Sequence, residues 1–174
     1  MIAIIRQAFA GSVYPPGAKV TNCSRQNCDE CNEIAREFDG KTWSSLTDVK
    51  YLRYYESALS LMTPEARRYY LPAFMIAALT DPVSADVILD GLEFGFTPPE
   101  TEGAEAEEWF AKFGQTQMEY FLNRNSGFTP AQKQAIKAYL EFEFHDEPES
   151  YWAYFPEKLQ ERKNVLDFWD TFAD

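Results

Sequence analysis

Apolar residues recur at helical spacing along most of the chain. After Thr129 and Pro130, four of them follow one helical face: Ile136, Tyr139, Leu140 and Phe144. Lysines and glutamates fill the positions between them, as on an amphipathic helix. Thr129 can accept hydrogen bonds from the first free amides, and Gln132 three residues later completes a capping box. The segment therefore predicts a helix that begins at about residue 130.

The same spacing predicts further helices, at about residues 32–38, 52–61, 82–92 and 115–123 and after Pro156. Thr63 can cap another helix in the same way as Thr129, and Pro64 suits its first position. We expect this helix to extend to about residue 80. Pro72 lies inside it, where a proline removes a backbone donor and crowds the preceding turn. We therefore expect a kink or a break near Tyr70 and Leu71.

Residues 95–108 lack this periodicity. The stretch is rich in proline, glycine and glutamate, which predicts an exposed acidic loop. No run of alternating apolar and polar residues predicts a β-strand. We expect an all-α fold, with one domain over residues 1–174, six to eight helices and one long acidic loop at about 95–108.

The composition restricts the classes of protein to which this chain can belong. Its 174 residues include 28 acidic and 16 basic side chains, a net charge of −12, and 45% are hydrophobic. That apolar share supports a packed core rather than a disordered acidic chain. The acidity argues against nucleic acid and membranes as partners, because both attract basic patches. No apolar run approaches the ~20 residues of a membrane helix, and we recognise no signal peptide, so we expect a cytoplasmic protein.

The negative charge is regional. Residues 1–60 carry seven basic and seven acidic side chains, so the whole excess falls on residues 61–174. Such a field can steer a basic protein partner, and exposed aromatic side chains can anchor it. The candidate partner-binding residues are Glu102, Glu105, Glu107, Glu108, Trp109, Glu141, Glu143, Asp146, Glu147 and Trp152.

Three cysteines lie within nine residues, at Cys23, Cys28 and Cys31. Thiolates at such short spacing can share one tetrahedral zinc ion, and the single histidine of the chain, His145, is a candidate fourth ligand. The alternative is that the thiols pack without metal at the start of a helix. The acidic neighbours Asp29 and Glu30 would raise the pKa of the thiols, which disfavours redox catalysis.

A second candidate site is the run Arg67, Arg68, Tyr69 and Tyr70 before Pro72. Its side-chain donors can satisfy carbonyls that the proline leaves free. Alternatively, the four side chains line a ligand pocket beside the most apolar segment of the chain.

Catalytic motifs are missing from the sequence. There is no phosphate-binding glycine loop, no dinucleotide-binding Gly-x-Gly-x-x-Gly and no Gly-x-Ser-x-Gly nucleophile turn. We therefore assign no catalytic residue, and the sequence favours a role other than that of an enzyme.

Three segments occur together in a recognisable order. They are Cys28-x-x-Cys31 at a predicted helix start, the segment from Thr63 to Pro72 (Thr-Pro-Glu-Ala-x-x-Tyr-Tyr-Leu-Pro), and the segment from Phe128 to Gln132 (Phe-Thr-x-x-Gln). In this order they resemble a bacterial family of unknown function. The resemblance covers most of the chain and implies no activity and no catalytic residues.

The leading hypothesis is a non-catalytic acidic binding protein. Its most concrete form is an immunity- or antitoxin-like protein that neutralises a basic effector. The alternatives are a zinc-stabilised helical domain and a small-molecule enzyme or sensor that uses the Tyr51–Tyr70 region.

Overall fold

The computed structural model describes residues 1–23, 28–99, 108, 110–112, 114–145 and 156–173. These residues form nine α-helices, one 3₁₀ turn and no β-strand, which confirms the all-α fold. The elements are α1 (Ile2–Phe9), α2 (Asp29–Phe38), η1 (Trp43–Ser45), α3 (Val49–Tyr54), α4 (Ala58–Leu61), α5 (Pro64–Thr80), α6 (Asp86–Phe96), α8 (Gln117–Asn125), α9 (Pro130–His145) and α11 (Pro156–Ala173).

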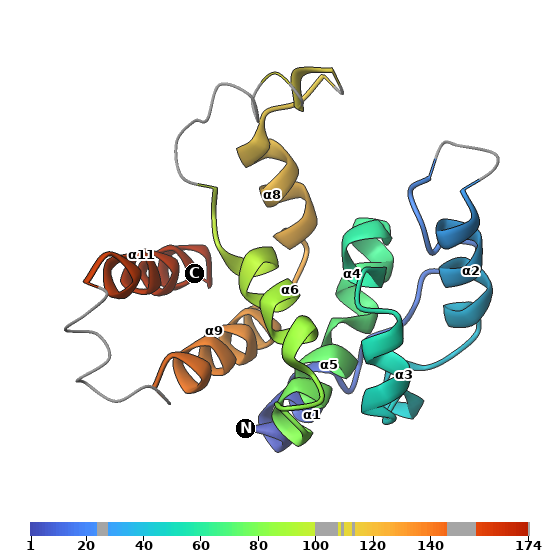
Figure 1. Ribbon diagram of the computed structural model, residues 1–174, viewed down its shortest axis with the longest axis horizontal. Coiled ribbons are helices and arrows are strands. Elements are labelled where there is room, and N and C mark those ends of the chain that lie inside the picture. Colours follow the sequence, from blue (N-terminus) through green and yellow to red (C-terminus); the bar gives the residue numbers. More distant parts are fainter. Residues whose placement is uncertain (24–27, 100–107, 109, 113, 146–155, 174) are drawn as a thin grey trace.

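Helix α5 is the centre of the arrangement. It contacts α1, η1, α3, α4, α6 and α8. Figure 1 shows α2 and α3 on one side of the molecule and the pair α9 and α11 on the other. One cluster of buried apolar residues joins these elements. No helix among the described residues is long and apolar enough to cross a membrane.

The sequence of α5 suits this central position. Its residues from Ala66 to Ala78 are buried with the exception of Arg68, and a helix that is apolar on all sides belongs in a protein interior. Pro72 lies in the middle, yet the helix continues from Pro64 to Thr80, so of the predicted kink or break near Tyr70 and Leu71 the break does not occur. Packing against neighbours on every side holds the helical turn despite the missing backbone donor.

The two helix starts predicted from Thr-Pro pairs are confirmed. The Thr63 hydroxyl accepts a hydrogen bond from the Ala66 amide at 3.1 Å. Thr129 and Gln132 form the predicted capping box, in which the Gln132 amide donates to the Thr129 hydroxyl at 3.3 Å and the Thr129 amide donates to Gln132 Oε1 at 2.9 Å. Both signals are local, and the structure realises them as local contacts.

Two predicted boundaries need correction. Helix α6 extends from Asp86 to Phe96 instead of the predicted 82–92, so Gly95 and Phe96, which we expected in the acidic loop 95–108, are helical. The reason is the fully buried Phe96 ring, which packs edge-on against Trp169 of α11 at 5.6 Å between centroids. The rest of the loop prediction falls mostly on residues 100–107, outside the described residues.

The second correction concerns the predicted helix at 52–61. It divides into α3 and α4, which are separated by residues 55–57. The Asp48 side chain begins α3 three residues earlier than expected, since it accepts hydrogen bonds from the amides of Lys50 and Tyr51 at 2.9 and 3.3 Å. Together with α1, which the sequence did not predict, this division explains why the described residues hold more helices than the expected six to eight.

Candidate functional site

The three cysteines come together at the start of α2. Cys28 is the N-cap residue of α2, and Cys31 lies buried in its first turn, so the Cys-x-x-Cys spacing places both on one side of the helix. Cys23 is exposed and approaches them from the preceding segment. The three Sγ atoms all lie within 4.8 Å of one another. Sulfur ligands for one soft metal ion are therefore gathered in one place.

Contacts with α4 hold this cluster in position. The backbone amide of Asn22 donates to the carbonyl of Leu61 at 3.2 Å, next to Cys23 in sequence. The Ser57 hydroxyl donates to the Glu30 carboxylate at 2.6 Å and so ties the first turn of α2 to the residue before α4. Both sides of the cluster are thus anchored to the same neighbouring element.

The cysteines differ in their affinity for protons. A hydrogen bond with the Cys31 thiol is the main cause that lowers the pKa of Cys28 below its ordinary value. Glu30 pushes the pKa of Cys28 upward, as the sequence predicted, but its effect is smaller, so the predicted net rise is wrong for Cys28. Burial raises the pKa of Cys31 to about 12, because the thiolate form loses its hydration.

The candidate fourth ligand belongs to a helix in a different part of the fold. His145 is the last residue of α9, and Figure 1 shows α9 and α2 on opposite sides of the molecule. Within the described residues, the group of candidate ligands consists of the three cysteines alone.

The structure separates the four residues of the Arg67–Tyr70 run. Arg67 lines a cavity of about 650 Å³. Arg68 lies outside that cavity and donates to the Ser126 carbonyl at 3.0 Å. Tyr69 lines a different cavity of about 410 Å³, and the Tyr70 hydroxyl donates to a carbonyl at the end of α2 at 2.5 Å. The two arginines thus point to different neighbours, whereas the rings of Tyr69 and Tyr70 contact each other at 4.9 Å between centroids. In the described contacts, neither guanidinium donates to a carbonyl of α5.

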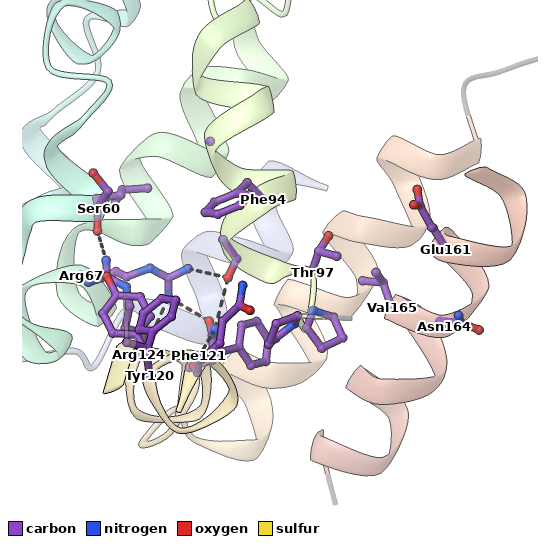
Figure 2. Close-up of a pocket in the computed structure, with 18 residues that line it drawn as sticks. Ser60, Arg67, Phe94, Thr97, Tyr120, Phe121, Arg124, Glu161, Asn164 and Val165 are labelled. Carbon is purple, nitrogen blue, oxygen red and sulfur yellow. Dashed lines mark hydrogen bonds between the residues drawn. The ribbon is translucent and has the colours of Figure 1, made fainter. Parts of the chain in front are cut away.

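The larger cavity lies between α5, α6, α8 and α11 (Figure 2). It brings Arg67 of α5 beside Arg124 and Asn125 of α8, where Arg67 donates to Asn125 Oδ1 at 2.9 Å and to the Arg124 carbonyl at 3.3 Å. The sequence did not single out Arg124. It lies 57 residues from Arg67 in a polar stretch, so no local signal links the two arginines.

Seven of the ten candidate partner-binding residues lie outside the described residues: Glu102, Glu105, Glu107, Trp109, Asp146, Glu147 and Trp152. Of the other three, Glu108 is exposed and lies 4.0 Å from Lys112, and Glu141 is exposed and pairs with Lys137 at 3.4 Å. Glu143 is half-buried. The prediction of a basic partner at these residues stays a prediction.

The fold and these two clusters define an all-α protein with a cysteine site and a cationic cavity. By sequence, a family of unknown function, DUF6714, matches residues 1–172, and the chain belongs to this family. The match agrees with the resemblance of most of the chain to a family without assigned activity. Neither a curated protein nor a solved structure matches the chain.

Proposed function

We propose that the protein binds zinc through Cys23, Cys28 and Cys31 and that the metal stabilises the start of α2. The observation that carries the proposal is the approach of the three Sγ atoms to within 4.8 Å of one another. Zinc binds thiolates at about 2.3 Å, which places the sulfurs of a tetrahedral site about 3.8 Å apart. The Sγ atoms therefore need to move closer to one another by about 1 Å at most to reach the distances of a tetrahedral zinc site.

The role of this zinc is structural. It ties the exposed Cys23 to Cys28 and Cys31 and so fixes the chain before α2. Because the unfolded chain does not offer a preformed site, zinc at about 100 times its Kd stabilises the folded state by about 2.7 kcal/mol. The fourth position falls to water, to an added ligand or to a residue outside the described part of the chain.

Elemental analysis tests the proposal on full-length protein purified without a metal-binding tag. We expect one equivalent of zinc per chain, and a chelator should lower the midpoint of thermal unfolding. Replacement of zinc by cobalt should give the charge-transfer absorption of thiolate ligands, which reports sulfur coordination directly.

Cys23→Ser is the informative variant, because Cys23 is exposed and its loss leaves the core intact. It should bind zinc much more weakly, whereas Asp29→Asn, a neighbour outside the sulfur cluster, should retain the metal. Zinc below about a tenth of an equivalent, with no loss of stability in chelator, would overturn the proposal.

A second candidate function is the binding of a basic protein partner, in the manner of an immunity or antitoxin protein. The observation that favours it is the outer face of α6. Asp90 and Glu93 are exposed and form no ion pair within the described residues, and the adjacent Phe94 ring, which also lines the larger cavity, is 82% exposed. An aromatic anchor with acidic neighbours suits a partner of positive charge, which the field of residues 61–174 would steer toward it.

Affinity capture at low and at high salt tests this candidate. We expect a specific basic protein that is retained at low salt and lost after the double substitution Asp90→Lys and Glu93→Lys. The control Asp39→Lys and Glu56→Lys changes the charge equally in the neutral N-terminal third and should retain the partner. Equal capture by both double variants would contradict the assignment of α6.

A further inference from the structure

The cavity between α5, α6, α8 and α11 has a buried cationic end. The side chains of Arg67 and Arg124 are 2% and 8% exposed, and both line the cavity. Arginine is rarely buried to this extent without a carboxylate partner. The cavity shares no residue with the cysteine cluster, so its chemistry does not depend on zinc binding.

The partners of the two guanidinium groups are all uncharged. Arg67 donates to Asn125 Oδ1 and to the carbonyls of Arg124 and Gly95, the last at 3.3 Å. Arg124 donates to the carbonyls of Leu59 and Met62. Among the described residues, no carboxylate forms an ion pair with either group. Two neighbouring positive charges are therefore buried without a negative charge beside them.

The position of this pair affects the pKa of Arg67. Burial and, next to it, repulsion by Arg124 lower the pKa of Arg67 to about 9. An anion beside the pair would relieve the repulsion and bring the pKa of Arg67 back toward its ordinary value. Donors remain for it: of five guanidinium N–H groups, Arg67 uses three in the described contacts, which leaves Nε–H and one Nη2–H.

The rest of the cavity is mostly apolar. Its wall includes Leu59, Phe121 and Val165, and its volume of about 650 Å³ is that of a small-molecule site. Glu161 also lines it, but Glu161 is exposed, and Figure 2 shows it on α11, away from the arginine pair. A ligand with one anionic end and an apolar body matches this gradient from cationic to apolar surface.

We propose that the cavity binds an apolar monocarboxylic acid. Its carboxylate accepts hydrogen bonds from Arg67 and Arg124, and its apolar body lies along Phe121 toward Val165. The carboxylate supplies the negative charge that the pair lacks, and Glu161 at the other side opposes the reversed orientation. Charge-assisted hydrogen bonds to guanidinium are the strongest of their kind, so they decide the orientation of the ligand.

A purely structural role for the arginines makes a different prediction. Arg124 ties the end of α4, and Arg67 ties the ends of α6 and α8, through carbonyl acceptors. If this were their whole role, the cavity would bind apolar molecules without regard to charge. Binding that depends on the carboxylate separates the two accounts.

The experiment is isothermal titration calorimetry of the full-length protein with decanoate, decanol and naphthoate, each below its solubility limit. We expect decanoate to bind at least about tenfold more tightly than decanol, because decanol cannot supply the charge. Naphthoate shows whether the body of the ligand is aromatic or aliphatic. Equal affinity for decanoate and decanol, or no binding of either acid, would overturn the proposal.

Three variants locate the binding. Arg124→Gln should weaken decanoate binding at least about tenfold, whereas Arg68→Gln, the neighbour of Arg67 that lies outside the cavity, should leave it unchanged. Gly91→Phe adds a side chain at the cavity wall, where a Cβ meets no atom within 4 Å, so it should block decanoate while the fold is retained. This variant keeps the test decisive if Arg124→Gln unfolds. Unchanged binding by Gly91→Phe would place decanoate elsewhere and refute the assignment.

Discussion

Tyr70 connects the central helix to the end of α2 through one hydroxyl. Its side chain is 1% exposed, and the hydroxyl donates to the Phe38 carbonyl at 2.5 Å and lies 3.2 Å from that of Lys41. Burial raises the pKa of Tyr70, since the phenolate form would lose its hydration. The ring packs edge-on against Phe38 at 5.2 Å between centroids. One buried side chain thus combines an aromatic contact with a long-range hydrogen bond.

Tyr70→Phe should destabilise the fold by about 1 kcal/mol, because it removes the hydroxyl but keeps the ring. The loss is modest because the Phe38 carbonyl still accepts from the Lys41 amide at 3.1 Å. Urea denaturation measures the change. Tyr54→Phe is the matched control, since Tyr54 is 72% exposed, and it should leave the unfolding midpoint unchanged. A Tyr70→Phe midpoint equal to that of the control would contradict the role of this hydroxyl.

The sequence could predict the chemistry of these side chains but not their targets. Tyr70 and Arg67 were expected to supply donors to carbonyls, and both do. The expected acceptors were the carbonyls freed at Pro72 in the same helix, whereas the actual ones lie 28 to 57 residues away in sequence. Residue type fixes which groups can donate, but only the packing of distant elements decides where they point.

At the scale of elements, helix α9 begins at an exposed capping box. Thr129 is exposed, so its hydroxyl contributes through the capping box with Gln132 rather than through burial. The helix behind it packs against α1 and α11, which makes its stability important for one side of the molecule.

Thr129→Ala should cost about 1 kcal/mol, because the first turn of α9 loses its hydroxyl acceptor. Thr129→Ser keeps an oxygen in the same position and should recover most of the loss. The free energy of unfolding in urea gives both values. Equal stability of the alanine and serine variants would show that the cap contributes nothing.

The starts of α5 and α9 were predictable because their Thr-Pro signals lie within three residues of the helix. The end of α6 was not, because Phe96 is held by Trp169, whose indole N–H also donates to the Phe96 carbonyl at 2.9 Å. These residues are 73 positions apart. The cysteine cluster likewise depends on a local signal and could be predicted from its spacing. The cavity depends on contacts between distant residues, since Arg67 and Arg124 meet only when α5 packs against α8.

At the scale of the whole molecule, the net charge of −12 has two opposing effects on stability. Repulsion among the acidic side chains disfavours the compact state, and salt screens it. Salt also weakens the seven ion pairs of the described residues, but the side chains in these pairs are 20% exposed or more. Exposed pairs each contribute little, so relief of the repulsion should dominate.

The midpoint of thermal unfolding should therefore rise when salt is added from a low to a physiological concentration at fixed metal content. A gain of about 1 kcal/mol corresponds to about 2–4 °C for a chain of this length. Sodium chloride and choline chloride should act alike, because screening depends on ionic strength rather than on the cation. A rise with sodium alone would indicate a cation site instead, and a midpoint that falls with both salts would mean that the ion pairs outweigh the repulsion.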